Sequence, residues 1–538
     1  MEVKQGITIC EGIASGEIFV YEKQAHGSPG ASPARPPQEE CERYESALKA
    51  VLAQQEDLRV RAAAHAGGDA SAIFEIHAML LEDEDFNAEI FRQIQREGKT
   101  CEEAVDAAGK LFATRFSGMD DPYFRERATD FTDIAGNLLD VLHDKQDALA
   151  EIDRPVIVVA KDLTPSETVR IPRQHILAFV TEKGSQSSHA AILARMMGIP
   201  ALTGISADPA WHGLPGIVNG ISGELAIRPN AHARQVADTL LRESGQEKMR
   251  LEAQRGRATQ TRGGKKVKLC ANIARPEDAD AAMQNDAEGV GLFRTEFLFL
   301  GRNTVPTEDE QFQAYLAVAQ KMQNRPVVIR TMDIGADKKA ESLALEPEEN
   351  PALGYRAIRI SLDRPALFLT QLRAILRAGA FGKLRIMLPM ITSMQEILRA
   401  KALLAQAKEQ LRARGLALGL DQFGIMIETP AAAIICDELA KEVDFFSIGT
   451  NDLTQYTLAA DRQNAKLDAW IDPHHPALLR LIEHTIQSGH REGCWVGICG
   501  ELAADTELTE TFIRMGIDEL SVSPSHILPM RAAIARLD

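Results

Sequence analysis

Reactive side chains in the second half of the chain stand where short apolar runs end. They are Arg294 after GVGLF, Arg330 after VVI, Glu428 after FGIMI, Asp452 after SIGTN and Cys499 after WVGI. Two carboxylates suit Mg²⁺, which takes few protein ligands and leaves positions for substrate oxygens. Guanidinium groups make paired, permanently charged contacts with phosphate and carboxylate, and a thiol can donate a proton. The set predicts a site for a small phosphorylated acid.

Each of these residues also has a purely structural interpretation. A single arginine at a strand end is more often part of a surface salt bridge, and a single cysteine is most often a buried small hydrophobe. The combination is more specific than any member. Arg356 and Arg462 lie on loops that can reach the same place. His474 and His475 are adjacent but have no spaced partner ligands, so we expect no metal there.

His189 is the candidate for chemistry in the first half. It lies in VTEKGSQSSHAAILARMMGIPALTG, residues 180–204, where a strand-like run leads through a polar loop into a helix beginning near Ala190. Ser187 or Ser188 can serve as the N-cap. A histidine at a helix start meets outward-pointing backbone N–H groups that favour an anion, so its imidazole is well placed to carry a phosphoryl group. From these residues alone, a histidine that merely caps the helix remains equally open.

The second half of the chain repeats a strand–helix pattern that would position Arg294, Arg330, Glu428, Asp452 and Cys499. Short apolar strands alternate with amphipathic helices from Lys265 onward. The strand candidates are KVKLCANI, GVGLFR, PVVIRT, LRIMLPM, FGIMIE, DFFSIG, CWVGIC and DELSV. Eight βα units in this length predict a (β/α)₈ TIM barrel, whose active sites lie at the C-terminal ends of the strands. The reactive residues fall at those ends.

The first half predicts an α/β domain interrupted by helices. Met1–Tyr21 alternates as strands do, and the Pro/Gly/Ser-rich stretch 25–37 reads as a linker. Apolar residues then recur at three- and four-residue steps, in four helical runs that suggest a bundle. Strand signals return at Arg154. We therefore expect a multidomain α/β protein with an inserted α-helical bundle, divided as 1–24 with 151–229, 36–146, a helical linker 230–264, and the barrel 265–538.

Composition narrows the class of protein. The 538 residues carry a formal net charge of −17, which argues against nucleic acid and anionic membranes as partners. Residues 36–143 hold 23 acidic against 11 basic side chains, so the predicted bundle is the most acidic segment. No apolar run is long enough to enter a membrane, the N-terminus lacks a signal-peptide pattern, and the seven cysteines form no CxxC pair. A cytoplasmic location is expected.

Several segments resemble the enzyme I family of the bacterial phosphotransferase system, the phosphoenolpyruvate–protein phosphotransferases. The similar segments are ITICEGIASG, LLEDEDF, DLTPSET, SSHAAILAR, GLFRTEFLF, RTMDIGADK, ENPALGYRAIRI, IGTNDLTQY, AADR and GICGELAAD. They extend over nearly the whole chain. The resemblance implies a phosphohistidine swivelling α/β domain with an inserted helical bundle that binds the phosphocarrier HPr. A TIM barrel that binds phosphoenolpyruvate and forms a homodimer would follow.

The resemblance also implies roles for individual residues. His189 would be phosphorylated, with Thr168 as a hydrogen-bond partner of its imidazole. The residues implied to bind phosphoenolpyruvate are Arg294, Arg330, Asn451, Asp452 and Arg462, with Arg356 as a further contact. Glu428 and Asp452 would hold Mg²⁺, and Cys499 would protonate the enolate of pyruvate. The phosphoryl group would pass from phosphoenolpyruvate to His189 and then to a histidine of HPr, starting sugar uptake.

Two departures and two alternatives accompany this interpretation. The loop Lys183–Ser188 lacks the family's usual Gly-Gly and Thr, and the chain ends at Asp538, earlier than usual in the family.

A phosphoenolpyruvate synthase or pyruvate, phosphate dikinase would share the histidine domain and the barrel but require an ATP-binding domain. No Gly-rich nucleotide-binding region precedes His189. A non-catalytic scaffold is the other alternative, and the complete set of reactive residues argues against it.

Overall fold

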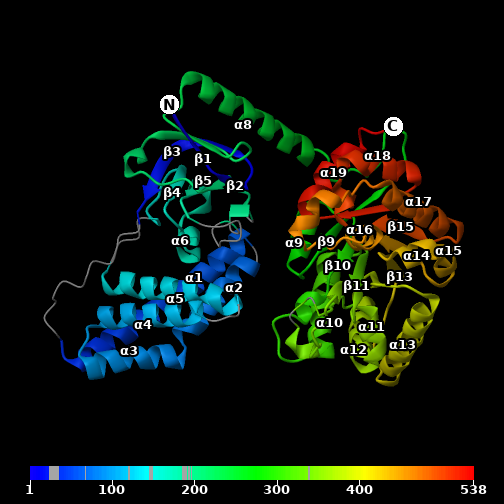
Figure 1. The fold of residues 1–538 in the computed structure, drawn as a ribbon, viewed down its shortest axis with the longest axis horizontal. Coiled ribbons are helices and arrows are strands. Elements are labelled where there is room, and N and C mark those ends of the chain that lie inside the picture. Colours follow the sequence, from blue (N-terminus) through cyan, green and yellow to red (C-terminus); the bar gives the residue numbers. More distant parts are fainter. Residues whose placement is uncertain are drawn as a thin grey trace. The chain divides into compact units, whose positions relative to one another are not determined.

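The computed structural model describes residues 1–22, 35–66, 68–118, 122–144, 149–183, 191, 194–195, 197–336, 338 and 340–538. The chain divides into two compact units, Met1–Gln246 and Glu247–Asp538 (Figure 1). Each unit is described by itself below. His189 and the loop around it, residues 184–190, lie outside the described residues.

A mixed sheet forms the α/β part of the first unit. Its strands are β1 (Glu2–Gln5), β2 (Ile7–Cys10), β3 (Ile13–Tyr21), β4 (Val156–Ala160), β5 (Ile176–Thr181), β6 (Ala201–Thr203), β7 (Pro215–Asn219) and β8 (Glu224–Ile227). Their spatial order is β1-β8-β7-β3-β4-β5-β6-β2. β3 and β4 are parallel neighbours, with Tyr21 opposite Ala160. The 134 or so intervening residues therefore form an insertion between two paired strands, as expected from the helical pattern.

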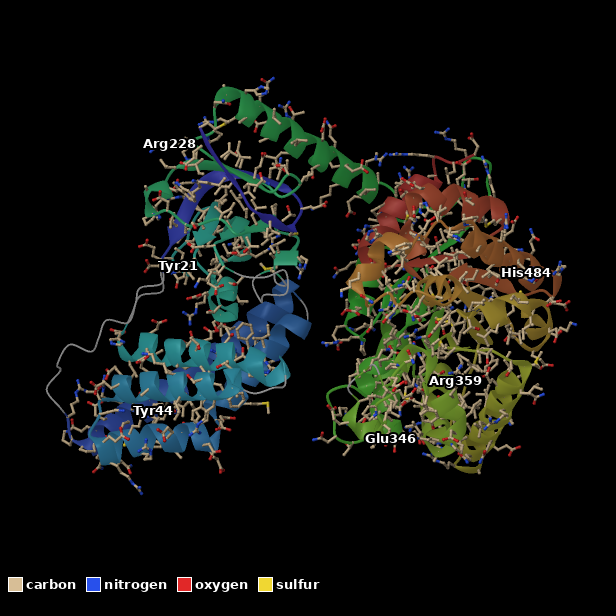
Figure 2. The ribbon with its side chains drawn as sticks, in the orientation of Figure 1. Tyr21, Tyr44, Arg228, Glu346, Arg359 and His484 are labelled. Carbon is tan, nitrogen blue, oxygen red and sulfur yellow. The ribbon has the colours of Figure 1, made fainter. Side chains whose placement is uncertain are left out.

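The inserted segment is a helical bundle. Its described helices are α1 (Pro37–Ala66), α2 (Gly68–Leu81), α3 (Glu84–Glu97), α4 (Cys101–Ser117) and α5 (Pro122–Leu142). A buried apolar cluster from α1 through α5 forms its core, which includes Tyr44 (labelled in Figure 2). The Tyr44 ring packs edge-on against Phe91. The sequence pattern suggests four helices, but the structure divides the second run at Asp83. The Asp83 side chain accepts a hydrogen bond from the Phe86 N–H and so begins a new helix.

A short helix joins the bundle to the sheet. α6 (Pro165–Arg170) starts with a capping box between Thr164 and Glu167. Arg170 Nη2 donates to Asn137 Oδ1 of α5 at 2.6 Å. The Tyr21 hydroxyl, at the end of β3, donates to Glu167 Oε1 at 3.0 Å. α6 is therefore tied to both the bundle and the sheet by polar contacts.

The connection between the units is mostly one exposed helix. α8 (Ala231–Glu252) buries only Ala237. The chain that follows it is fixed on the barrel by the fully buried Arg531, whose Nε donates to Thr259 Oγ1 at 3.0 Å. Arg531 also forms an ion pair with Asp286 at 2.5 Å. Arg531 therefore holds Thr259, in the chain that follows α8, against Asp286 of the barrel unit.

The second unit is a closed barrel of eight parallel strands. They are β9 (Lys268–Ile273), β10 (Val290–Phe293), β11 (Val327–Arg330), β12 (Leu384–Leu388), β13 (Gln422–Ile427), β14 (Phe445–Ile448), β15 (Trp495–Ile498) and β16 (Glu519–Val522). β16 closes the barrel by pairing with β9, and Leu520 lies opposite Leu269. All eight strands coincide with the apolar runs expected from the sequence, so the predicted TIM barrel is confirmed.

Helices surround the barrel and bury their apolar faces against it. They are α9 (Asp278–Gln284), α10 (Glu308–Lys321), α11 (Ile358–Asp363), α12 (Pro365–Ala378), α13 (Met394–Ala413), α14 (Pro430–Ile434), α15 (Cys436–Leu439), α16 (Thr450–Leu458), α17 (Pro476–Arg491), α18 (Thr506–Met515) and α19 (Ile527–Ile534). One continuous cluster of buried apolar residues fills the space between strands and helices. No helix among the described residues is long and apolar enough to cross a bilayer.

Candidate active site

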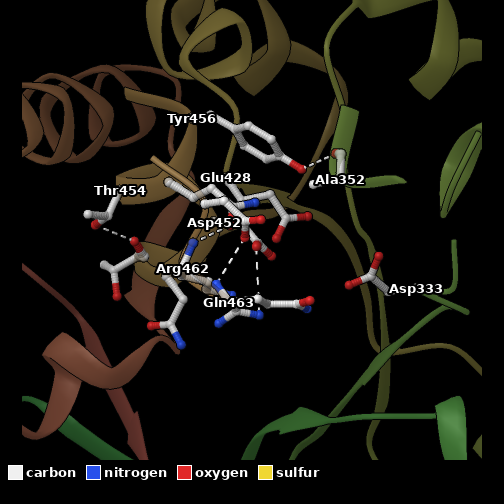
Figure 3. A network of polar contacts seen from close by, with 12 residues as sticks. Asp333, Ala352, Glu428, Asp452, Thr454, Tyr456, Arg462 and Gln463 are labelled. Carbon is white, nitrogen blue, oxygen red and sulfur yellow. Dashed lines mark hydrogen bonds and ion pairs between the residues drawn. The ribbon is translucent and has the colours of Figure 1, made fainter. Parts of the chain in front are cut away.

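The barrel residues singled out by the sequence line one cavity of about 770 Å³. They are Arg294, Arg330, Arg356, Glu428, Asn451, Asp452, Arg462 and Cys499. Figure 3 shows part of this group, with Glu428, Asp452 and Arg462 close together. The structure thus brings all of these residues into one place.

Strand ends explain the convergence. Arg330 is the last residue of β11. Arg294 directly follows β10, Glu428 directly follows β13 and Cys499 directly follows β15. Asp452 lies in the first turn of α16, the helix after β14. Because parallel strands of a barrel end on the same face, residues distant in sequence meet there.

A buried carboxylate joins two of the arginines. Asp333 Oδ2 lies 3.0 Å from Arg330 Nη1, and Asp333 Oδ1 accepts a hydrogen bond from Arg356 Nη2 at 2.9 Å. Glu296 Oε1 accepts from Arg330 Nη2 at 2.9 Å. Burial disfavours ionisation of Asp333, but the two guanidinium groups outweigh it and hold its pKa well below the usual range. Asp333 therefore stays charged and fixes both arginines.

The two fixed arginines keep unused donors. Both are almost completely buried, and the Nε atoms of Arg330 and Arg356 have no hydrogen-bond partner among the described residues. A buried N–H without a partner is costly. The arginines are thus prepared to bind negatively charged oxygens that enter the cavity.

Glu428 is a carboxyl in an unfavourable electrostatic position. It is 1% exposed, and the Met390 N–H donates to its Oε1 at 2.5 Å. Burial raises the pKa of Glu428, and the neighbouring carboxylates of Asp452 and Asp333 raise it further. A divalent cation beside Glu428 and Asp452 would reverse this effect. Both residues therefore fit a metal.

A metal at this place would have few protein ligands. No group of three or more His, Cys, Asp or Glu side chains within the described ranges is arranged to hold a metal ion. Mg²⁺ is commonly held by one or two carboxylates together with water and substrate oxygens. The pair Glu428 and Asp452 matches that pattern.

The cavity mouth carries more exposed polar groups. Arg462 Nη2 lies 3.8 Å from Asp452 Oδ1, and its side chain is 46% exposed. Arg294 is also exposed. Asn451 is held more firmly, since its Nδ2 donates to Glu501 Oε1 at 3.0 Å and its Oδ1 accepts from the Glu501 N–H at 2.9 Å. Arg294 and Arg462 therefore place positive charge at the opening, where the exposed Asp461 and Glu501 also lie.

Cys499 lies at the floor of the cavity. It is 3% exposed, and its Sγ lies 3.7 Å from the Ile448 carbonyl oxygen, to which it can donate. Burial raises the pKa of the thiol to about 11. At neutral pH the group therefore holds its proton and can act as an acid.

One wall of the cavity is a loop held by a tyrosine. The residues 349–353, which include the 3₁₀ turn Pro351–Leu353, line the cavity opposite α16. The Tyr456 hydroxyl of α16 donates to the Ala352 carbonyl oxygen at 2.5 Å (Figure 3). The same hydroxyl accepts from Arg356 Nη1 at 3.4 Å.

Sequence reasoning did not single out Asp333, Glu296 or Tyr456. Asp333 and Tyr456 stand in the segments RTMDIGADK and IGTNDLTQY, but their partners are set by the fold. A carboxylate between two arginines of distant segments has no local spacing signal.

The adjacent histidines His474 and His475 each contact a neighbouring residue. His474 Nε2 lies 2.6 Å from Asp505 Oδ2, and His475 Nδ1 accepts from the Ala477 N–H at 3.2 Å.

Two predicted site residues, His189 and Thr168, belong to the first unit, and the structure describes Thr168. Thr168 is fully buried on α6, and its Oγ1 donates to the Thr164 carbonyl oxygen at 2.9 Å. A hydroxyl that donates in this way retains its acceptor lone pairs. Its contact with His189 stays a prediction, because His189 lies outside the described residues.

Family models match each part of the chain. A model described as "PEP-utilising enzyme, PEP-binding domain" matches residues 248–538, which is more than half of the chain. "PEP-utilising enzyme, N-terminal" matches residues 5–127, and "PEP-utilising enzyme, mobile domain" matches residues 152–223. The mobile-domain match includes the segment that carries His189.

Curated relatives named phosphoenolpyruvate-protein phosphotransferase match along almost their whole length. The relative from Bacillus sp. (strain S) is 43% identical, with 93% of this chain and 87% of the relative covered. That from Priestia megaterium is 40% identical, with 99% and 94% covered. An NMR solution structure of an Enzyme I protein, 28% identical, covers 45% of this chain and 99% of its own, at a TM-score of 0.40. By its family models and its relatives, this chain belongs to the phosphoenolpyruvate–protein phosphotransferase family of PEP-utilising enzymes.

Proposed function

We propose that the protein transfers the phosphoryl group of phosphoenolpyruvate to its own His189 and then to a histidine of the phosphocarrier HPr, releasing pyruvate. The observation that carries this proposal is the cavity in which four arginines, the buried carboxylates of Glu428 and Asp452 and the protonated thiol of Cys499 meet. This set matches a phosphorylated carboxylic acid whose enolate must be protonated. Sugar uptake by the phosphotransferase system is the process this transfer would start.

In the first transfer the phosphorus–oxygen bond of phosphoenolpyruvate breaks while a bond from phosphorus to the His189 imidazole forms. Arg294, Arg330 and Arg462 bind the substrate oxygens with Asn451 and Asp452, and Arg356 gives a further contact. Such fixed donors stabilise charge on the transferring group without having to reorganise. The leaving enolate takes a proton from Cys499 at its methylene carbon, which yields pyruvate.

Mg²⁺ is the metal we assign to Glu428 and Asp452. When bound, it supplies positive charge to the phosphate oxygens. The electrostatic position of Glu428, buried beside Asp452 and Asp333, supports this assignment. Asp333 itself is already paired with Arg330 and Arg356, which leaves the other two carboxylates for the cation.

The second transfer requires HPr to dock beside the α/β domain. We assign the bundle, residues 36–146, as its docking domain, and 1–24 with 151–229 as the swivel domain. The bundle carries many acidic residues, and Met79 on α2 is 70% exposed. Both features support a partner with a basic and apolar surface. The α6 contacts keep bundle and sheet together, so HPr on the bundle would dock on the same unit as the α/β domain.

Association and location complete the proposal. We infer a homodimer through the barrel domain 265–538, with the connection 230–264 between it and the swivel domain. Exposed Ile434 and Trp470 on the barrel support association. Sedimentation of the full chain across a concentration series tests the dimer, and a monomer at every concentration would overturn it.

A cytoplasmic location is also part of the proposal. The seven free cysteines fit a reducing cytoplasm.

A pyruvate assay with HPr tests the proposed function. Wild type with phosphoenolpyruvate, Mg²⁺ and an excess of dephosphorylated HPr should release one pyruvate for each HPr that becomes phosphorylated. Cys499→Ala should lose most of the rate of this release, while Cys494→Ala, which removes a buried thiol at the opposite end of β15, should keep it. Absence of pyruvate from folded wild type would refute the proposal. Labelling of His189 from ATP would instead favour a dikinase.

A further inference from the structure

The cavity wall formed by residues 349–353 is attached to the barrel at two places. Near its end, Arg359 Nη1 donates to the carbonyl oxygens of Leu353 and Gly354 at 3.0 and 2.7 Å. At its middle the wall is held by Tyr456 alone among the described contacts, through the hydrogen bond to the Ala352 carbonyl. Figure 3 shows this bond above the Glu428 and Asp452 carboxylates.

Tyr456 stands on the same helix as the substrate-binding residues. α16 carries Asn451 and Asp452 in its first turn and Tyr456 in its second. The Tyr456 hydroxyl therefore links this helix to the wall 349–353 and, by accepting from Arg356 Nη1, to the Arg356 guanidinium group. Burial raises the pKa of the phenol, so it remains a hydrogen-bond donor at neutral pH.

We propose that Tyr456 is a positioning residue that clasps the wall 349–353 to α16 and thereby keeps Arg356 in its binding orientation. The inference rests on the proposed function, since it assigns how one wall of the phosphoenolpyruvate cavity is held in place. The clasp contacts no reacting atom. It holds the cavity in the same form before and during the reaction, so its loss removes ground-state and transition-state binding equally.

The conservative variant Tyr456→Phe tests this role. It removes the hydroxyl and keeps the ring. Loss of one such hydrogen bond should raise the KM for phosphoenolpyruvate about fivefold and leave kcat within about twofold, because uniform binding is lost. Tyr355→Phe is the matched control, since its hydroxyl donates to Asp363 Oδ2 at 2.6 Å away from the cavity. The control should keep the wild-type KM.

Proteolysis gives a second measurement that is independent of turnover. Glutamyl endopeptidase cleaves after glutamate, and Glu348 and Glu349 precede the clasped residue. In the full chain, Tyr456→Phe should be cleaved at these sites about fivefold faster than wild type. Phosphoenolpyruvate with Mg²⁺ should slow that cleavage. Tyr355→Phe should be cut at the wild-type rate.

The outcomes separate the clasp from the proposed function. A higher KM with faster cleavage in Tyr456→Phe alone supports the clasp. Wild-type KM and cleavage in that variant would overturn the clasp while pyruvate release still upheld the function. A fall in kcat with unchanged KM would also overturn it, since that pattern places Tyr456 in the transition state. If wild type released no pyruvate, the proposed function itself would fail.

Discussion

At the scale of single residues, the cavity combines groups whose charge states are set by their surroundings. Asp333 is held ionised by two arginines, Glu428 is pushed towards its neutral form, and Cys499 keeps its proton. Burial acts on all three, and only Asp333 has paired cations that outweigh it. The same barrel face therefore holds an ionised carboxylate, a carboxyl whose pKa is raised and a protonated thiol.

Neutralising either proposed metal ligand should weaken the response to Mg²⁺. Glu428→Gln and Asp452→Asn each replace a carboxylate by an amide, a poorer ligand for a hard dication. We expect the Mg²⁺ concentration for half-maximal pyruvate release to rise about tenfold or more. Asp461→Asn is the control, because Asp461 lies at the cavity rim with an exposed side chain that accepts from the Gln463 N–H. Unchanged Mg²⁺ dependence in both cavity variants would contradict the assignment.

Alkylation tests the protonation state of Cys499. Only the thiolate reacts with iodoacetamide, so labelling of Cys499 should be slow at pH 8 and rise about tenfold per pH unit towards its pKa of about 11. The half-exposed Cys41 should be labelled first at pH 8. Peptide mass spectrometry of the native chain measures both. Rapid labelling of Cys499 at neutral pH would mean that its thiol is ionised and is not the acid.

At the scale of elements, helix starts determine where side chains point. Asp83 begins α3 and so divides a run of helical periodicity that looks continuous in the sequence. α16 begins at Thr450 and directs its first turn into the cavity. Gly500, just after β15, lies so close to this start that an added Cβ would come within 2.0 Å of Thr450 Oγ1 and 2.7 Å of the Thr450 nitrogen.

Gly500→Ala should therefore displace the start of α16. We expect a loss of about 1–3 kcal/mol in the free energy of unfolding from overpacking. Pyruvate release should fall by up to about a hundredfold, because Asn451 and Asp452 move with the helix. The comparison is Gly245→Ala, where the added methyl meets nothing within 4 Å. Denaturant titration and pyruvate release measure the two effects, and full activity in Gly500→Ala would show that α16 tolerates the shift.

At the scale of the whole molecule, charge is divided unequally between the parts. The segment 36–143 carries 23 acidic and 11 basic residues, whereas the whole chain has 77 acidic and 60 basic residues. Most of the excess negative charge thus lies on the bundle, where HPr is proposed to dock. Long-range attraction of this kind accelerates encounter more than it strengthens the final complex.

Transfer from His189 to HPr should therefore slow several-fold as salt rises, since exposed charges are screened within about 8 Å at physiological ionic strength. Reversing the exposed charges of Glu82, Glu84 and Asp85 should lower the association rate, while Asp83 is kept because it caps α3. Reversal of Glu409, Asp437 and Glu438 on the barrel is the control. Stopped-flow transfer across a salt series measures both, and salt-independent transfer in wild type would rule out steering.

Much of this architecture is predictable because its signals are local. Apolar runs ending in Arg294, Glu428 or Cys499 predict both the strands and the face on which these residues meet. The Asp333 bridge and the Tyr456 contact with Ala352 are not predictable in this way, since they depend on where separate loops pack. The break at Asp83 was missed because a capping aspartate within an acidic run gives no distinct signal.

The site of phosphorylation is the most direct test of the central claim. Wild-type protein should be incubated with Mg²⁺ and phosphoenolpyruvate labelled in its phosphate, then digested under alkaline conditions that preserve phosphohistidine. The account predicts one acid-labile phosphate per chain on His189 and one pyruvate released for each. His189→Ala should bind phosphoenolpyruvate by calorimetry yet yield neither product. Pyruvate formed without label on His189, or label on another residue, would contradict the account.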